Sequence, residues 1–151
     1  MAEYITTTDN LVALNGTIPF NSVSIPCNKG LVVPVAPGIL ILKGNTPNSF
    51  ARYEVRVQAN VAVPTDGDIT AIALGIALDG AVIPESVAIY TPQAVEEYGH
   101  INTVAVITVP SGCCLTVSAR YVDGTEDDAA TTPTPSVTVR RAASISVTRI
   151  A

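Results

Sequence analysis

Charged residues and long apolar runs are scarce in this 151-residue chain, and tryptophan is absent. The first two scarcities each argue against a class of protein. Charged residues make up 14% of the sequence, against about 25% in an average globular protein. The net charge of −5 argues against a nucleic-acid partner, which would need a basic patch to hold phosphates. No apolar stretch approaches the roughly 20 residues that cross a bilayer, which argues against a membrane protein.

Signals of secretion and disulfide bonding are also missing. The opening MAEYITTTDN has neither the basic start nor the apolar run of a signal peptide. Cys27, Cys113 and Cys114 are an odd number for a closed disulfide framework. Neighbours on a strand point to opposite faces, so Cys113 and Cys114 are poorly placed to bond each other. We expect buried, reduced thiols in a protein made in a cytosol.

Motifs for catalysis and for cofactor binding are absent as well. The single histidine, His100, lies in EEYGH without a second histidine or a G-x-S-x-G motif, and we interpret it as a loop histidine at the entrance of a strand. No glycine-rich phosphate loop occurs, and the Cys and His spacing does not fit zinc. We therefore expect no enzymatic activity, no catalytic residues and no cofactor.

One acidic stretch leaves a metal site open. Four carboxylates fall within six residues, and hard cations such as calcium bind oxygen ligands: Asp123, Glu126, Asp127 and Asp128. The stretch lacks the full calcium-loop pattern of alternating acids with a central glycine. We prefer a solvated acidic loop within Asp123–Pro135, and we keep calcium binding as the alternative.

The remaining sequence is typical of an all-β protein, because apolar or alternating runs are separated by Pro, Gly, Asn and Asp. We expect strands at Leu31–Val35, Ile39–Lys43, Ala51–Val63, Thr70–Leu78, Ala81–Ile89, Asn102–Val109, Cys113–Tyr121 and Ser136–Ile150, the last open to a break, with short strands near Leu11–Leu14 and Thr17–Phe20. Asp79-Gly80 predicts a hairpin turn, and Pro110-Ser111-Gly112 predicts another turn. After Pro92, Gln93–Tyr98 is expected to form one turn of helix.

The length is that of one domain. Residues 1–30 have widely spaced Pro and Gly and too few apolar residues for a core of their own. We expect them to form an extended N-terminal arm for attachment or inter-subunit contacts. Residues 31–151 are expected to form the folded domain.

Two of the expected strands are apolar on both faces. In Thr70–Leu78 the large residues Ile72, Leu74, Ile76 and Leu78 alternate with small ones. The stretch NTVAVITVP, within Asn102–Val109, is also apolar on both sides. Such strands need a cover on their outer side, and the sequence offers no helical layer. We therefore expect a second subunit, or another sheet, to pack on a face made of Ala71, Ala73, Gly75 and Ala77.

The order of the segments resembles a family of small proteins from phages and prophages of Gram-positive gut bacteria. The resemblance covers about Phe20 to Ala151 and is carried by NSVSIPCNKG, GILILKG, ARYEVRVQANVAVPTDG, IALGIALDGAVIP, TPQAVEEY, VPSGCCLTVSARY and ISVTRIA. VPSGCCLTVSARY is its most specific part. The family is similar to the C-terminal domain of collagen-like spore-surface glycoproteins. The resemblance implies an all-β, jelly-roll β-sandwich of the TNF/C1q type that forms a homotrimer.

The same resemblance implies a structural role in a virion. The expected function is that of a head decoration (auxiliary capsid) protein or short head fibre, which binds the major capsid protein on the outer capsid surface and reinforces the shell. Such a protein would be assembled in the host cytoplasm. The alternative is an adhesion module of a phage fibre or spore surface that binds a host receptor or host surface glycans. The aromatic content of 5% makes that alternative the weaker one.

Overall fold

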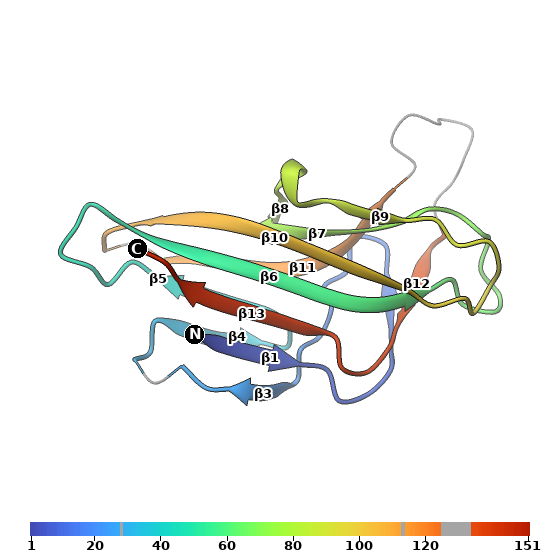
Figure 1. Ribbon diagram of the computed structural model, residues 1–151, viewed down its shortest axis with the longest axis horizontal. Helices are drawn as coiled ribbons and strands as arrows, with labels where there is room; N and C mark the ends of the chain where they lie inside the picture. The colour runs from blue at the N-terminus through green and yellow to red at the C-terminus, as the bar shows by residue number, and fades with distance from the viewer. Residues whose placement is uncertain (28, 113, 125–133) are drawn as a thin grey trace.

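Two antiparallel β-sheets packed face to face make up the computed structural model, which describes residues 1–27, 29–112, 114–124 and 134–151 (Figure 1). Sheet A contains β1 (Ala2–Ile5), β2 (Asn10–Ala13), β3 (Ser22–Ile25), β6 (Phe50–Ala62), β10 (Gly99–Pro110), β12 (Ser136–Val139) and β13 (Ser144–Arg149). Sheet B contains β4 (Val32–Ala36), β5 (Ile39–Lys43), β7 (Ile72–Leu78), β8 (Ala81–Val82), β9 (Ala88–Tyr90) and β11 (Cys114–Asp123). The expected all-β sandwich is confirmed.

Helical structure in the described ranges is limited to one 3-10 turn, η1 (Pro84–Ser86). No helix of the described chain is long and apolar enough to cross a membrane. The helical turn expected at Gln93–Tyr98 is wrong, because this segment consists of bends and turns. Glu96 has a φ of 58°, in the left-handed region, which is incompatible with a right-handed helical turn.

Strand β6 is the centre of sheet A. It pairs along its whole length with β10, from Gly99↔Val61 to Pro110↔Phe50, and its other side pairs with β13 and then β12. The alternation read from ARYEVRVQANVAV is confirmed, because Tyr53, Val55 and Val57 are buried and the residues between them are half-buried or exposed. Sequence alternation therefore assigns the inner face of this strand correctly.

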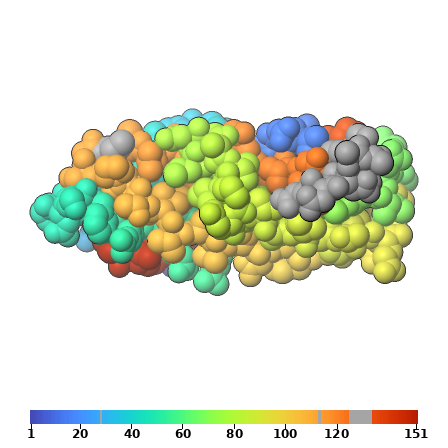
Figure 2. Space-filling model, turned by 90° about the horizontal axis from the view of Figure 1, so that it is seen from above, coloured from blue at the N-terminus to red at the C-terminus, as the bar shows by residue number. Residues whose placement is uncertain are grey.

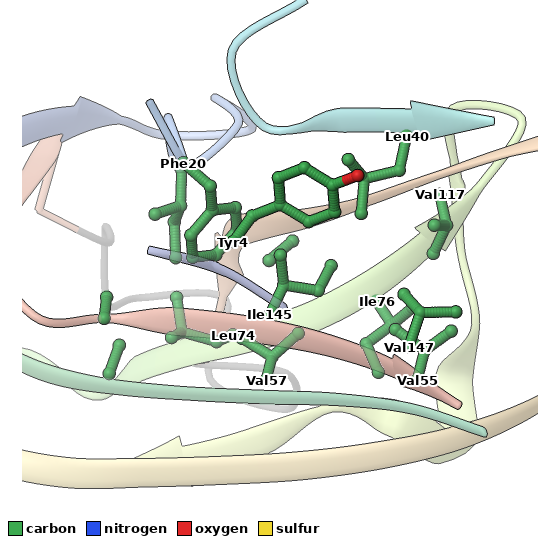
Figure 3. Close-up of a cluster of buried hydrophobic side chains, with 14 of the residues drawn as sticks. Tyr4, Phe20, Leu40, Val55, Val57, Leu74, Ile76, Val117, Ile145 and Val147 are labelled. Carbon is green, nitrogen blue, oxygen red and sulfur yellow. The ribbon is translucent and has the colours of Figure 1, made fainter. Parts of the chain in front are cut away.

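The core lies between the inner faces of the two sheets (Figure 3). Val55 and Val57 of β6 and Ile145 and Val147 of β13 face Leu74 and Ile76 of β7, together with Tyr4, Phe20, Leu40 and Val117. Two buried tyrosines satisfy their hydroxyls with backbone carbonyls. Tyr53 Oη donates to Lys43 O at 2.6 Å, and Tyr121 Oη donates to Thr134 O at 2.7 Å. A buried phenol needs such an acceptor to offset the loss of water.

The N-terminal residues belong to the sandwich, so the expectation of an extended arm over residues 1–30 is corrected. Strand β1 pairs with β13 and β3, and the β2 strand pairs with β12. Tyr4 is 3% exposed and reaches the core. The chain then crosses to sheet B, where Asn15 N donates to Tyr121 O and Ile18 N to Ala119 O. The attachment and inter-subunit roles expected of this segment stay predictions.

The turn between β7 and β8 is the expected hairpin. Asp79 and Gly80 have φ values of 50° and 86°, the combination that a two-residue hairpin turn of mirror-image type requires. Asp79 Oδ1 also accepts hydrogen bonds from Thr116 N at 2.8 Å and Thr116 Oγ1 at 3.1 Å. The turn is thereby tied to β11.

Strand β4 is an edge strand of sheet B and carries a proline. Lys43 N donates to Leu31 O, and the register pairs Val33 with Ile41, so Leu31 and Val33 direct their backbone groups towards β5. Val32 and Pro34 therefore face the open edge, since alternate residues of an antiparallel strand point their backbone groups in opposite directions. Proline has no N–H to donate, which limits strand addition at this edge.

Candidate functional site

The small-residue face of β7 is covered by the same chain. Ala73, Gly75 and Ala77 are buried. A Cβ built on Gly75 would lie 2.6 Å from Val82 Cγ1 and 3.3 Å from Val87 Cγ2. The cover is the segment β8–η1–β9, which faces the viewer in the middle of the molecule in Figure 2 (yellow-green).

The covered face of β7 corrects part of the expectation that a second subunit, or another sheet, packs on it. The face of Ala71, Ala73, Gly75 and Ala77 is a packing face, and three of its members are already buried without a second subunit. Expecting another subunit to cover those three was wrong, because the stretch Ala81–Ile89 is not one strand. Pro84 begins a 3-10 turn there, and the turn brings Val82 and Val87 back over β7.

Ser86 fixes this cover at the edge of β7. β9 pairs with residues 72–74 of β7 and β8 with residues 77–78, which leaves Ile76 between the two ladders. Ser86 Oγ accepts a hydrogen bond from Ile76 N at 2.8 Å and donates to Ile83 O at 2.7 Å. Ile83 N donates to Ile76 O at 2.9 Å. A buried serine thus supplies the contacts that a continuous partner strand would have made.

The outer face of β10 has no such cover in the described residues. Val104 is 47% exposed and Val106 is 58% exposed, between the exposed Asn102 and Thr108. We call these four uncharged residues the β10 stripe. β10 pairs with β6 alone among the described strands, so the stripe lies on an edge strand. Exposed apolar side chains on an edge strand are typical of an interaction surface.

On sheet A, the side chains beside Val104 and Val106 are either short or form an ion pair with each other. Val104 is opposite Arg56 and Val106 is opposite Glu54 in the register of β6. Arg56 Nη2 and Glu54 Oε1 form an ion pair at 3.1 Å, so their charges offset each other. The next strand, β13, places Ser146 opposite Arg56. Arg52, opposite Thr108, adds a positive charge beside one end of the stripe, so its border is close to neutral along Val104 and Val106.

An apolar groove of about 330 Å³ lies at the opposite edge of the sandwich, between β3 and β4. Tyr4, Phe20, Val23, Pro34 and Val35 are among its lining residues. The groove is the place where the two edge strands leave the core open. Tyr4 and Phe20 are 3% and 4% exposed, so they close its floor and offer no open aromatic face to a sugar ring.

The cysteines occupy different environments. Cys27 is half-buried beside a hollow of about 290 Å³. Burial raises the pKa of its thiol, but backbone hydrogen bonds from Val32, Lys29 and Leu31 outweigh burial, so the pKa lies below its ordinary value. Cys114 is exposed at the start of β11, which makes the expectation of a buried thiol wrong there. Cys113 lies outside the described residues.

Of the remaining residues singled out by sequence, the described ones, His100 and Asp123, lie apart from each other on different sheets. His100 is the second residue of β10, exposed, with Nδ1 3.2 Å from Asn60 Oδ1. Asp123 ends β11 and is exposed, whereas the other three acidic candidates, Glu126, Asp127 and Asp128, lie outside the described residues. In the part of the chain that the structure describes, no three His, Cys, Asp or Glu side chains could jointly hold a metal ion. The calcium alternative stays a prediction.

Sequence reasoning missed one polar cluster, at the end of sheet A beyond β10. The Arg140 guanidinium lies 4.7 Å from the centre of the Tyr98 ring. Burial raises the pKa of Tyr98, and the carboxylates of Glu96 and Asp9 raise it further while Arg140 lowers it. Residues from three separate segments meet here, so no local pattern could reveal the cluster.

Comparisons with known proteins give a fold and no sequence family. No family model matches the chain, and no curated protein matches it significantly. The solved structure of Eiger TNF from S. frugiperda superposes with a TM-score of 0.58 and 10% identity, covering 99% of this chain and 91% of that one.

Two further solved structures superpose less closely. The C-terminal domain of EclA, a sugar-binding protein, has a TM-score of 0.37 at 13% identity, covering 94% of this chain and 79% of that one. A family 35 carbohydrate-binding module from Clostridium thermocellum has a TM-score of 0.36 at 12% identity, covering 96% and 98%. The strand order and the likeness to Eiger TNF over nearly the whole length make this chain a jelly-roll β-sandwich of the TNF-like fold.

Proposed function

We propose that this chain is a structural virion protein, a head decoration protein or short head fibre that binds the outer capsid surface as a homotrimer and reinforces the shell. The observation that carries the proposal is the β10 stripe, with Val104 and Val106 about half exposed on an edge strand. A charged fraction of 14% and the resemblance to small phage proteins support it further. The proposed role needs no catalytic residue or cofactor.

The β10 stripe is proposed as part of the contact between subunits. Fully burying a valine side chain contributes on the order of 1.5–3 kcal/mol. Two valines per copy can therefore supply part of the free energy of association between subunits. A closed cyclic trimer fits threefold or quasi-threefold positions of a capsid lattice. Each copy can then bind weakly while the trimer binds firmly, since the second and third contacts form at high effective concentration.

The oligomeric state is the first test. Size-exclusion chromatography with light scattering at micromolar concentration is expected to give three times the chain mass of 15.6 kDa. A strictly monomeric mass at that concentration would contradict the trimer. Replacing both valines in Val104→Thr/Val106→Thr keeps the branched shape and is expected to shift the mass towards the monomer.

Capsid binding is the second test. Purified protein is added to undecorated capsids of the parent particle and, separately, to host cells. Retention by capsids alone supports decoration. Retention by host cells alone contradicts the proposal in favour of the adhesion module of a phage fibre or spore surface, with host receptors or surface glycans as partners.

A further inference from the structure

One edge of the sandwich has apolar residues that face inwards and are nevertheless exposed. Val23 of β3 is opposite Tyr4 in the register, and residues opposite each other on paired strands point to the same face. Tyr4 faces the core, so Val23 faces inwards as well, but Val23 is 51% exposed. Pro34 of β4 is opposite the buried Leu40 and is also exposed. The described chain therefore leaves the space between β3 and β4 unfilled.

This space is the apolar groove of about 330 Å³, which we call the β3–β4 groove. None of the described residues that line it carries a charge. An apolar cavity of about 150 Å³ holds a molecule the size of benzene. The groove is therefore large enough for one ring with a side group, and it falls at the lower end of the range of about 300–1,000 Å³ that is typical of ligand sites.

Tyr4, in the floor of the groove, has a hydroxyl without a partner. Tyr53 and Tyr121 donate to backbone carbonyls. The Tyr4 hydroxyl has no hydrogen-bond partner among the described residues, although Tyr4 is only 3% exposed. A buried phenol in this state has lost the hydrogen bonds that it made to water in the unfolded chain and has gained none in return.

The position of the Tyr4 hydroxyl places its free donor at the groove. Figure 3 shows the Tyr4 ring beside Phe20, with the hydroxyl pointing towards Leu40. Leu40 pairs with Pro34, which lines the groove, so the hydroxyl lies on the β4 side of the groove. Burial, with a smaller contribution from Cys27, raises the pKa of Tyr4, so the phenol stays protonated and able to donate.

The rim of the groove is poorly suited to an extended peptide, which would pair with the backbone of an edge strand. On the β4 side, Pro34 and Pro37 have no N–H to offer, and the pairing of β4 with β5 is irregular between Pro34 and Ala36. On the other side, β3 is four residues long, and its pairing with β1 is irregular between Glu3 and Tyr4. The groove thus offers an apolar shape and one donor in place of a continuous strand edge.

We infer that the β3–β4 groove binds a small uncharged molecule that has one ring and one hydrogen-bond acceptor, such as a ketone. The ring fills the core between Val23 and Pro34, and the acceptor receives the hydrogen bond from Tyr4 Oη. The ligand is uncharged because the lining has no charged side chain to offset the cost of removing an ion from water. The inference does not depend on the proposed function, since the groove lies at the opposite edge of the sandwich from the β10 stripe.

Two matched probes test the inference. Acetophenone and ethylbenzene have the same ring and nearly the same shape, but only acetophenone carries an acceptor. Ligand-observed NMR measures the dissociation constant of each probe for the parent, for Tyr4→Phe and for Val23→Glu, which places a charge in the groove. Leu11→Glu, at an exposed residue of the edge strand β2, is the matched control. The melting temperature confirms folding, and Val35→Glu, at a lining residue 54% exposed, replaces Val23→Glu if that variant does not fold.

The parent is expected to bind acetophenone about three- to tenfold more tightly than ethylbenzene, the factor that one hydrogen bond supplies. In Tyr4→Phe this difference should fall below about twofold, while ethylbenzene binds as it does to the parent. Val23→Glu should weaken the binding of both probes at least about tenfold, and Leu11→Glu should leave both within about twofold of the parent.

Several outcomes overturn the inference. One is the absence of saturable acetophenone binding to the parent, and another is binding that the glutamate in the groove leaves unchanged. Equal affinities of the two probes for the parent contradict the role of Tyr4. Benzoate, which has the same ring and a negative charge, is the third probe, and benzoate binding that is as tight as that of acetophenone and is lost in Val23→Glu contradicts an uncharged ligand.

The melting temperature of Tyr4→Phe gives a check that needs no ligand. Tyr4→Phe should keep the melting temperature of the parent because it removes no hydrogen bond, whereas Tyr121→Phe should lower it because it removes the bond to Thr134 O. A similar decrease in both variants would show that the Tyr4 hydroxyl has a partner within the fold, and it would overturn the inference.

Discussion

Strands β7 and β10 are both apolar on both faces, yet the chain treats their outer faces differently. The outer residues of β7 are Ala and Gly, and the chain folds its own segment 81–90 onto them, close enough that Gly75 has no room for a Cβ. The outer residues of β10 include Val104 and Val106, which stay half exposed. The small side chains leave room for Val82 and Val87 of the same chain, whereas the valines project from an edge strand and are available to another protein.

The largest effect is expected from the inner face of β7. Leu74 is fully buried, so Leu74→Ala removes core contacts and leaves a cavity, at a cost of about 2–5 kcal/mol of unfolding free energy. Urea denaturation at neutral pH measures this. A loss below about 1 kcal/mol would mean that the two faces of β7 are assigned wrongly.

Alkaline pH probes the same side of the sandwich through Tyr121, which pairs with Leu74 in the register. Burial, with a smaller contribution from Asp123, raises the pKa of Tyr121 from 10.0 to about 12. The neutral phenol is favoured in the fold, so its contribution is complete below about pH 10 and is lost as the pH rises towards 12, on the order of 2–3 kcal/mol. Stability measured from pH 8 to pH 12 (about one reading per pH unit) follows this loss.

Tyr121→Phe is the control for the pH experiment. It removes the hydrogen bond to Thr134 O and costs about 1 kcal/mol at neutral pH. The variant should lose less stability than the parent between pH 10 and pH 12. Identical alkaline slopes for the two proteins would show that Tyr121 does not titrate with the fold.

The cover of β7 is tested by Gly75→Leu. Its Cβ would meet Val82 Cγ1 at 2.6 Å, so the segment 81–90 must shift, at a cost of about 1–3 kcal/mol. Thermal denaturation measures the cost. Val82→Ala in the same background removes the clashing methyl groups and should recover part of the loss, whereas additive effects of the two changes would argue against contact between these residues.

The smallest effect on stability is expected at the β10 stripe. In a single copy, Val104→Thr/Val106→Thr changes exposed positions and should alter the unfolding free energy by less than about 0.5 kcal/mol. Dilute samples in urea measure this, alongside the oligomer mass at higher concentration. Leu11→Thr, at a residue 66% exposed on β2, is the matched control and should leave the mass unchanged.

A large part of the fold could be predicted because local patterns express it. Alternation assigns the buried faces of β6 and β7, the bounds of β5 agree with the sequence, and Asp79-Gly80 has the expected turn geometry. In residues 1–30 the strand expected near Leu11–Leu14 is present as β2, whereas β1 and β3 were missed because they are short and gain their stability from pairing with each other and with distant β13. A short stretch of sequence does not show which distant strand it will pair with.

The candidate surface could be predicted in part. The doubly apolar pattern of NTVAVITVP indicates that β10 needs a partner, and its valines are indeed uncovered in the described chain. The pattern of β7 gives the same indication, and only the three-dimensional path of Val82 and Val87 distinguishes the two strands.

Pro34 on the open edge of sheet B affects how copies of the chain associate when they are concentrated. An edge that offers hydrogen-bond donors in series can recruit strand after strand and grow into a fibre. A gap in that series at Pro34 interrupts such growth. Copies crowded together would then associate through side chains, which favours assemblies of finite size over filaments.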